Sequence, residues 1–211
     1  MAQRIGITMR VVDASGYVEP RDALAQDWGR FLAQALPNHM WMPLPNVRGT
    51  VLDIVRGWQL DGFILSGGND LGDAPERDET ERALLAHAAS TGRPVLGVCR
   101  GLQVIQDFYD GPLSDCEREE HVATRHEIEV NKNGPALGAK AGTHTVNSFH
   151  AKGIERLASP LAPFATARTT WIEGAFHPDT PLVGIMWHPE REPQPTALDR
   201  ALMTHLFGAD H

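Results

Sequence analysis

The chain has 211 residues, of which 42% are apolar and 22% are charged, and its formal net charge at pH 7 is −8. This balance is ordinary for a soluble globular protein, and without a lysine or arginine cluster the chain is not expected to bind nucleic acid by neutralising phosphates. No apolar stretch approaches the roughly 20 residues that cross a bilayer, and the N-terminal sequence lacks a secretory cleavage pattern. We therefore expect a cytoplasmic protein without membrane association.

Short apolar runs alternate with helical patterns along most of the chain. Strands are expected at residues 5–9, 41–44, 62–65, 95–98 and 182–187. Helices are expected at residues 22–36, 77–90, 101–109 and 196–207. The second helix has a capping-box-like start, formed by Asp78 and Glu81. The alternation predicts an α/β fold with a mainly parallel central sheet flanked by helices, in one domain spanning residues 1–211.

Between residues 127 and 176 the pattern changes to short strands with little helix between them. The runs HEIEV, THTVN, PFATAR and WIEGAF occupy residues 126–130, 143–147, 163–168 and 171–176. They predict a small strand-rich extension within the same domain.

The segment PVLGVCRGLQ, residues 94–103, places Cys99 between two glycines directly after an apolar run. Glycine–x–nucleophile–x–glycine between a strand and a helix is typical of a nucleophile elbow, whose crowded backbone needs small flanking residues. The N-terminus of the following helix would lower the pKa of the thiol. Taken alone, a buried cysteine in a glycine-rich turn explains the segment equally well.

The candidate partner of Cys99 lies at the end of the last apolar strand, in the segment LVGIMWHPERE. Residues two apart in an extended segment point to the same side, so Glu190 is expected to accept the Nδ1–H of His188. Pro189 favours extended backbone at the residue before it. With Cys99 these residues make a nucleophile, a base and an orienting acid, although a solvated turn would also account for this short motif.

A third element is the segment FILSGGNDLG, in which an apolar strand runs into Gly67 and Gly68. Paired glycines let backbone N–H groups turn toward a developing negative charge, as an oxyanion hole requires. Ser-Gly-Gly-Asn is also ordinary loop chemistry. The loop is expected at the same sheet edge as Cys99, because each follows a predicted parallel strand.

These segments together resemble the class I glutamine amidotransferase superfamily, and within it the stand-alone γ-glutamyl hydrolases. The matching pieces are SGGNDL, RDETE, PVLGVCRGLQ, VNSFH and GIMWHPE, which occur in the family's order. The resemblance implies a flavodoxin-like fold and a catalytic triad of Cys99, His188 and Glu190. It also implies an oxyanion hole formed by the backbone N–H groups of Gly68 and Arg100.

The resemblance further implies a set of substrate-binding residues: Arg10, Asn69, Gln103, Ser148, Phe149 and His150. Gln103, Ser148 and Phe149 would hold the α-amino acid end of a glutamyl group. No catalytic role is expected for His150, because Ala151 follows where family hydrolases often have a second histidine. The segment YDGPLSDC departs from the family's glycine-rich segment, which leaves ligand contacts there open.

The activity implied is hydrolysis of a γ-glutamyl amide through a thioester, with release of glutamate and without a cofactor or metal. The segments GITMR and LSGGNDL look most similar to γ-glutamyl-CDP-amidate hydrolases, which act in the phosphoramidate decoration of bacterial capsular polysaccharide. The leaving group would then be cytidine diphosphoramidate. Its diphosphate would need cations, and the candidates are Arg10, Arg21, Arg77 and Arg100, although each is individually more typical of a solvated surface.

Other functions stay open at this point. The chain could be a glutaminase subunit that passes ammonia to a separate synthase, or a hydrolase of γ-glutamyl amines. It could also be a binding module that keeps the fold without the chemistry. A homodimer and a complex with a synthase partner are both compatible with the sequence.

The remaining chemically reactive residues are expected to be structural. Cys116 lies in an acidic stretch that would raise its thiol pKa, which predicts an inert cysteine. His121 and His126 suggest a metal, but no ligand set with recognisable spacing completes them, so a structural or surface role is favoured. The run EREE, residues 117–120, is expected to be a solvated face.

Overall fold

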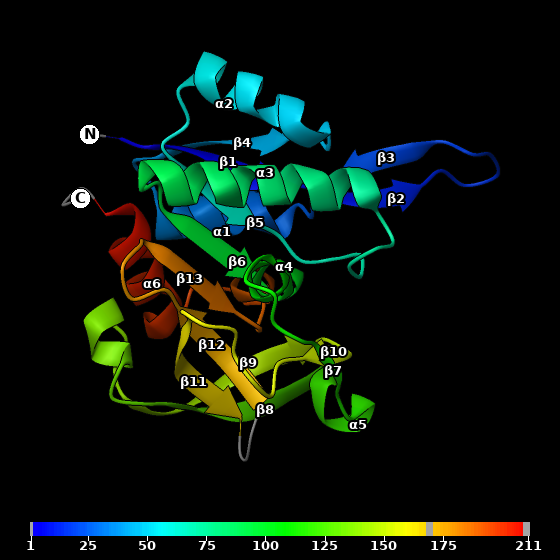
Figure 1. The fold of residues 1–211 in the computed structure, drawn as a ribbon. Helices are drawn as coiled ribbons and strands as arrows, with labels where there is room; N and C mark the ends of the chain where they lie inside the picture. The colour runs from blue at the N-terminus through cyan, green and yellow to red at the C-terminus, as the bar shows by residue number, and fades with distance from the viewer. Residues whose placement is uncertain (1, 168–170, 209–211) are drawn as a thin grey trace.

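The computed structural model describes residues 2–167 and 171–208. Its centre is a nine-stranded sheet in the order β4-β1-β5-β6-β13-β12-β11-β8-β9 (Figure 1). The first five strands of this order pair in parallel, and the other four continue the sheet in antiparallel pairs. The predicted fold class is therefore confirmed, but the strand-rich extension supplies nearly half of the sheet.

The parallel strands are β1 (Arg4–Thr8), β4 (Met40–Leu44), β5 (Gly62–Leu65), β6 (Val95–Val98) and β13 (Leu182–Ile185). The antiparallel strands are β8 (Val122–Val130), β9 (Gly142–Phe149), β11 (Ala162–Ala167) and β12 (Trp171–Phe176). Of the predicted extension strands, the last residue of PFATAR, Arg168, lies outside the described residues.

Helices cover both faces of the parallel half of the sheet. Helices α1 (Asp27–Ala35) and α6 (Ala197–Phe207) pack on one face, in an apolar cluster that includes Ile64. Helices α2 (Val51–Trp58), α3 (Pro75–Thr91) and α4 (Arg100–Phe108) pack on the other, in a cluster that includes Phe63 and Leu65. Successive residues of β5 thus enter opposite cores, which explains why this strand is a continuous apolar run rather than an alternating one.

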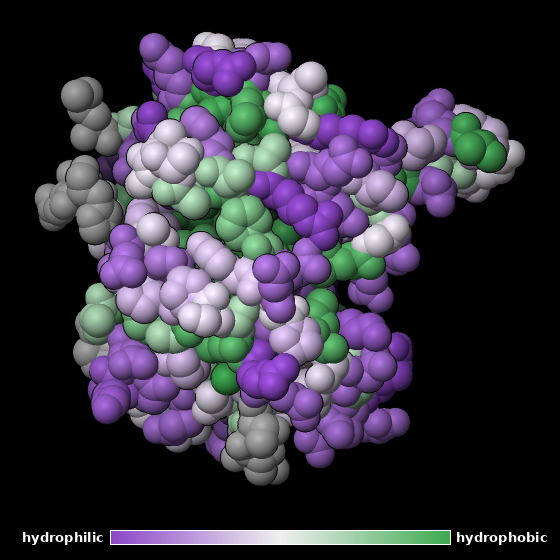
Figure 2. Space-filling view, viewed as in Figure 1, coloured by the Kyte–Doolittle hydropathy of each residue, from purple (hydrophilic) through white to green (hydrophobic). Residues whose placement is uncertain are grey.

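The N-terminal region differs from the prediction. The helix expected from residue 22 begins at Asp27, because β3 (Pro20–Ala23) pairs with β2 (Arg10–Asp13) in an antiparallel hairpin. The hairpin projects from the body of the protein as an arm (Figure 2). Neither this arm nor α2 was predicted from the sequence.

The predicted capping box at Asp78 is wrong. Helix α3 begins earlier, at Pro75, and the Asp78 carboxylate instead accepts the N–H of Gly72 at 2.8 Å. A capping box does form at α6, where the Thr196 hydroxyl accepts the N–H of Asp199 and the Asp199 carboxylate accepts the N–H of Thr196. None of the described helices has the length and apolar character needed to cross a bilayer.

Short elements close the antiparallel half. Strand β7 (Ser114–Asp115) pairs with β10 (Lys152–Gly153), and α5 (Arg118–His121) leads into β8. Residues 117–120 are exposed, as predicted. Three 3₁₀ turns, Arg48–Thr50, Gly134–Leu137 and Pro189–Arg191, lie in connections of the described chain.

Two glycines allow the tight turn between β6 and α4. A Cβ on Gly97 would lie 2.5 Å from the Cδ1 of Ile105, and a Cβ on Gly101 would lie 2.2 Å from the carbonyl oxygen of Leu65. Helix α4 therefore starts in direct contact with the end of β5, and larger residues would force the two apart.

Gly101→Ala is expected to lower the free energy of unfolding by about 1–3 kcal/mol or more, the usual cost of overpacking a core. Gly57→Ala is a matched control, because it is also helical but has no atom within 4 Å of the added Cβ. That change should raise the free energy of unfolding by roughly 0.5–1 kcal/mol. Urea denaturation measures both, and equal stabilities of the two variants would contradict the close approach at Gly101.

Candidate active site

Cys99 occupies the turn between β6 and α4, at the carboxyl edge of the parallel strands. Its backbone has φ 54° and ψ −105°, which L-residues rarely adopt, and its N–H donates to the carbonyl of Ile185 at 2.7 Å. The residue is buried, with 6% of its surface exposed. This strained strand-to-helix corner has the backbone geometry of a nucleophile elbow.

The two other predicted elements follow the strands on either side of β6. The glycine loop, which contains Gly67 and Gly68, follows β5, and His188 follows β13. The carboxyl ends of parallel strands meet at one edge of a sheet, so chain segments far apart in the sequence converge there. The sheet order therefore brings the three predicted motifs together.

His188 and Glu190 are in direct contact, with 2.7 Å between the imidazole Nδ1 and the carboxylate Oε1. Both side chains are buried. The contact was predicted, but its expected cause was wrong: residues 189–191 form a 3₁₀ turn rather than an extended segment, and the turn brings Glu190 back toward the ring. The hydrogen bond leaves Nε2 as the nitrogen available for a proton transfer.

The electrostatic environment favours a protonated His188. Burial alone would lower its pKa, but the charge of Cys99, hydrogen bonding with Cys99 and then Glu190 outweigh burial and raise the pKa to about 9. An imidazolium beside a thiolate is the resting pair of an activated cysteine, and it holds the proton that a leaving group needs.

Two residues of β9 position His188 from the antiparallel half of the sheet. The Asn147 side chain accepts the N–H of His188 at 2.9 Å and donates to its carbonyl at 2.8 Å. The ring of Phe149 packs edge-on against the imidazole, with centroids 5.8 Å apart, and Arg191 stacks over the same ring at 4.0 Å. Asn147 was not singled out from the sequence, although it lies within the segment VNSFH.

The glycine loop packs directly on the histidine. A Cβ on Gly67 would lie 2.6 Å from the Cε1 of His188. Gly68 has φ +104°, and a Cβ there would lie 2.9 Å from the Nε of Arg10. A small cavity of about 40 Å³ opens between the loop, His188, Arg10 and Arg191. The loop thus needs glycine at both positions, and Arg10 covers it from the arm.

Arg77 fixes the direction of the loop's peptide groups. Its buried guanidinium donates to the carbonyl oxygens of Ser66 at 2.5 Å and Gly67 at 3.1 Å. In a trans peptide the C=O and the N–H point in opposite directions, so the N–H of Gly68 points away from Arg77. The Gly68 N–H is therefore not occupied by Arg77 and stays a candidate oxyanion donor.

Arg77 and Arg100 are not diphosphate contacts, because other groups of the protein already engage their guanidinium groups. This corrects both expectations. Arg77 also donates to the Glu81 carboxylate at 3.0 Å. The Arg100 side chain is buried and pairs with Asp78 and Glu81 of α3. Only the backbone of Arg100 remains a candidate for the oxyanion. Arg21 is engaged on the arm, with Glu19 at 2.5 Å and the Tyr17 hydroxyl at 2.6 Å.

Three side chains that were predicted to bind substrate make contacts within the protein instead. Asn69 accepts the N–H of Val11 at 2.8 Å and donates to its carbonyl at 2.9 Å, as a neighbouring strand would. The hydroxyl of the fully buried Ser148 donates to the carbonyl of His121 at 2.6 Å. His150 is buried, with its Nδ1 3.7 Å from the sulfur of Cys116. These engagements leave no group of the three side chains directed at the cavity beside His188.

Gln103 and Cys116, two other residues singled out from the sequence, are both buried. The buried Gln103 donates to the carbonyl of Lys152 at 2.9 Å, which joins the first turn of α4 to the antiparallel half. Burial, followed by the charge of Glu173 and other carboxylates, raises the pKa of Cys116 to about 12. The inert character predicted for Cys116 is consistent with this, although burial contributes more than the acidic residues.

The chain is similar to known proteins over most of its length. The peptidase C26 family matches residues 5–190. A γ-glutamyl-CDP-amidate hydrolase of Campylobacter jejuni is 32% identical over 194 residues, which cover 89% of this chain and 90% of the relative. A subunit of the glutamine-hydrolysing GMP synthase of Methanospirillum hungatei is 30% identical over 148 residues, 70% of this chain and 71% of that one. The crystal structure of a putative GMP synthase subunit from Thermoplasma acidophilum superposes with a TM-score of 0.74 at 20% identity, covering 99% of this chain and 94% of that chain.

The imidazole of His188 is expected to titrate near pH 9, and its pKa should fall in both Cys99→Ala and Glu190→Gln. Each change removes a negative charge that favours the imidazolium, and the fall should be larger for Cys99→Ala because Cys99 contributes more than Glu190. NMR titration of the ring proton, assigned with His188→Gln, measures this. Glu79→Gln, on the exposed side of α3, should leave the midpoint unchanged. A midpoint that does not move in Cys99→Ala would contradict the pairing.

Arg77→Lys is expected to reduce the turnover number about tenfold or more while the protein stays folded, because a misdirected oxyanion donor costs up to roughly 100–1,000-fold. Lysine keeps the positive charge but cannot hold two carbonyl groups in a fixed fork. Arg82→Lys is the matched control on the same helix, since Arg82 is half-exposed and pairs with Asp107. Steady-state kinetics and thermal unfolding separate the two effects, and equal turnover in both variants would refute the role of Arg77.

Proposed function

We propose that this chain, which belongs to the peptidase C26 family, is a cysteine hydrolase that cleaves the amide bond of a γ-glutamyl group and releases glutamate. The observation that carries the proposal is the convergence of Cys99, the His188–Glu190 pair and the Gly67–Gly68 loop at the ends of adjacent strands. A nucleophile, an oriented base and backbone donors at one edge are the parts that acyl transfer requires.

In the first half of the reaction, the Cys99 thiolate attacks the γ-carbonyl carbon and a tetrahedral intermediate forms. The N–H groups of Gly68 and Arg100 hold its oxyanion, a contribution of about 3–4 kcal/mol for each donor in comparable sites. The imidazolium of His188 then protonates the leaving nitrogen, and the C–N bond breaks to leave a thioester on Cys99.

In the second half, neutral His188 takes a proton from water, which attacks the thioester carbonyl. The same oxyanion donors hold the second tetrahedral intermediate. The C–S bond breaks, the thiolate of Cys99 is restored and glutamate leaves. Glu190 keeps the Nδ1–H of the ring hydrogen-bonded throughout, so that Nε2 exchanges the proton.

For the leaving group we propose a nucleotide-linked nitrogen, as in the name of the Campylobacter jejuni relative. Arg10 supports this assignment, because it lies against Gly68 and beside the cavity next to His188. Arg191 lies at the same cavity and stacks on Phe149. Two guanidinium groups at the cavity next to His188 suit a diphosphate, which they would bind through charge-assisted hydrogen bonds.

The assay that tests the proposed function compares glutamine, a γ-glutamyl amine and γ-glutamyl-CDP-amidate with the purified protein. Glutamate release is expected from the nucleotide-linked compound, with the highest kcat/KM of the three. Cys99→Ala should abolish it, and Cys116→Ala, which removes the other cysteine, should retain it in folded protein. Activity that survives in Cys99→Ala would refute the mechanism.

Arg10→Ala is expected to raise KM for the nucleotide-linked substrate by roughly 10-fold or more, because hydrogen bonds between charged groups contribute about 1.5–3 kcal/mol. KM for a γ-glutamyl amine should change little, since that substrate has no phosphate. Arg21→Ala, on the same arm but paired with Glu19, is the control. An equal rise in KM for both substrates would show that Arg10 holds the glutamyl end and not a diphosphate.

The second candidate is a glutaminase subunit that supplies ammonia to a separate synthase. The similarity to the GMP synthase subunit of Methanospirillum hungatei favours it. Under this alternative, the isolated chain would release little ammonia from glutamine, and a synthase partner would raise the rate. Full activity of the isolated chain on γ-glutamyl-CDP-amidate, with no turnover of glutamine, excludes it.

A further inference from the structure

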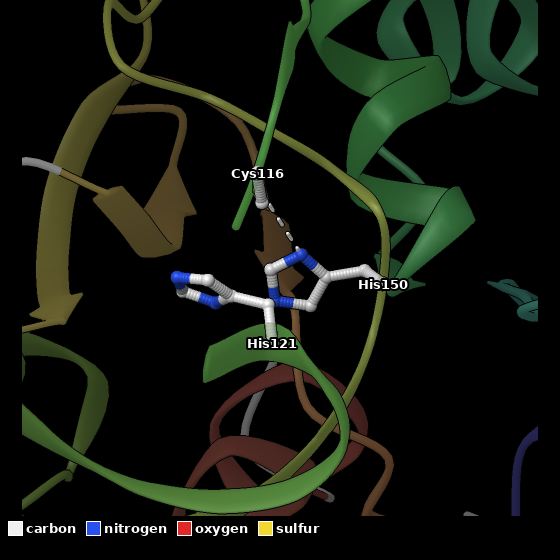
Figure 3. A group of neighbouring side chains, drawn as sticks. All are labelled: Cys116, His121 and His150. Carbon is white, nitrogen blue, oxygen red and sulfur yellow. Dashed lines mark hydrogen bonds between the residues drawn. The ribbon is translucent and has the colours of Figure 1, made fainter. Parts of the chain in front are cut away.

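A second group of reactive side chains lies in the antiparallel half of the sheet, apart from the candidate active site. It comprises two overlapping sets of candidate metal ligands that share His121: Cys116, His121 and His150, and His121, His126 and Glu173. They come from separate segments, namely the chain after β7, the end of α5, β8, the chain after β9, and β12. In Figure 3 the sulfur of Cys116 faces the ring of His150, and the side chain of His121 lies beside them, from three of these segments.

All members of this group, the histidine cluster, except the partly exposed His126 are buried, and five of its polar atoms lack a hydrogen-bond partner. Glu173 is fully buried, and His121 and His150 are only 2% and 3% exposed. The atoms without a hydrogen-bond partner are Nδ1 of His121, Nε2 of His126, Nε2 of His150 and both carboxylate oxygens of Glu173. Buried polar atoms are normally paired, and five orphans in one place call for a missing partner.

The orphaned atoms face one another around the Glu173 carboxylate. Nε2 of His150 is 3.5 Å and Nδ1 of His121 is 3.8 Å from Oε1 of Glu173, whereas Nε2 of His126 is 3.5 Å from Oε2. These separations are long for hydrogen bonds. They are close to the distance between two ligands of one tetrahedral cation, about 3.3–3.6 Å for bonds of about 2.0–2.2 Å.

The other nitrogen of His150 is already oriented. Its Nδ1 lies 3.1 Å from the carbonyl oxygen of Lys152, a partner to which it can only donate. That hydrogen bond places the free electron pair on Nε2, the orphaned atom. Metal-binding histidines are commonly held in this way by a carbonyl behind the ring.

We propose that His121, His126, His150 and Glu173 bind one divalent transition-metal cation of the zinc class. Three imidazoles and a carboxylate suit Zn²⁺ and its neighbours, whereas Mg²⁺ and Ca²⁺ prefer oxygen ligands alone. Cys116, whose sulfur faces the Nδ1 of His150, borders the site and is not needed to complete four ligands.

The surface offers a route for a cation into the site. A cavity of about 640 Å³ reaches His121 and His126 from outside, and its walls include Glu117, Glu120 and Glu127. A rim of carboxylates attracts cations toward the mouth. His126 is the most accessible of the four ligands, with its side chain 15% exposed.

A cation here would tie together the segments behind the candidate active site. The His121 carbonyl accepts the N–H of His150 at 3.0 Å and the hydroxyl of Ser148 at 2.6 Å. Ser148 lies between Asn147 and Phe149, the two residues of β9 that position His188. The site would thus stabilise the support of His188 without touching the substrate.

Metal content and thermal stability test the proposal directly. Untagged protein carrying Cys99→Ala, which removes the other thiol able to bind zinc, is stripped with a chelator, incubated with ZnCl₂ and passed over a desalting column. One zinc per chain and a raised Tm are expected. Both should be lost in His121→Ala and Glu173→Gln and retained in His144→Ala, whose ring bonds to the Lys140 carbonyl outside the cluster.

Because Glu173 is buried, Glu173→Gln could unfold the protein, and His126→Ala serves as the second variant. It should stay folded and weaken zinc binding at least tenfold in competition with a chromogenic chelator. Less than a tenth of a zinc per chain in the folded parent protein, or equal zinc in His121→Ala, would overturn the site.

Cobalt identifies the ligands. Co²⁺ should give the strong visible bands of a tetrahedral site without the near-ultraviolet charge-transfer band of a thiolate ligand. A charge-transfer band that disappears in Cys116→Ser would overturn the assignment of Glu173 as the fourth ligand. None of these measurements depends on the proposed hydrolase activity.

Discussion

The candidate active site depends on a buried group of charges on one side of helix α3. Two guanidinium groups, those of Arg77 and Arg100, meet two carboxylates, those of Asp78 and Glu81, with almost no exposure to solvent. Removing one partner from such a group leaves an uncompensated buried charge, which typically costs about 3–5 kcal/mol. Each arginine is also joined to a segment of the candidate active site: Arg100 follows Cys99, and Arg77 holds the glycine loop. Helix α3 therefore fixes the two halves of the expected oxyanion hole relative to each other.

The parallel and antiparallel halves of the sheet contribute different parts of the candidate active site. The parallel half supplies the strand ends from which Cys99, His188 and the glycine loop project, because only parallel strands end at a common edge. The antiparallel half supplies Asn147 and Phe149, which support His188 through its backbone and its ring. Since β12 pairs with β13, the two halves are hydrogen-bonded at the strand that precedes His188. The strand-rich extension, which was expected from the sequence to be small, thus supports His188.

Local sequence patterns predicted the strands and the segments that reach the site, but not what each side chain contacts there. The strands β5 and β6 were predicted to the residue, because both are continuous apolar runs, the first opening with Gly62 and the second preceded by Pro94. The arm of β2 and β3 escaped prediction, since it is stabilised by Asn69 from far along the chain rather than by its own apolar pattern. Ser148 and His150 were expected to face substrate, yet Ser148 near the end of β9 and His150 directly after that strand both turn toward His121. From the sequence, only His121 and His126 were considered together as metal ligands. The other members of the histidine cluster come from segments that are brought together only in the folded protein.

The contacts of Asn69 connect the arm with the helix that holds the glycine loop. Its side chain clamps the backbone of Val11 at the base of the arm, and its Oδ1 also accepts from Arg77 at 3.2 Å. Arg10, next to that clamp, is thereby placed over Gly68. The residue that directs the loop's N–H groups and the residue that covers the loop therefore share one support. Under the proposed function, a phosphate that draws Arg10 toward it would act on the loop expected to hold the oxyanion, and Asn69 would then couple binding of the leaving group to stabilisation of the transition state.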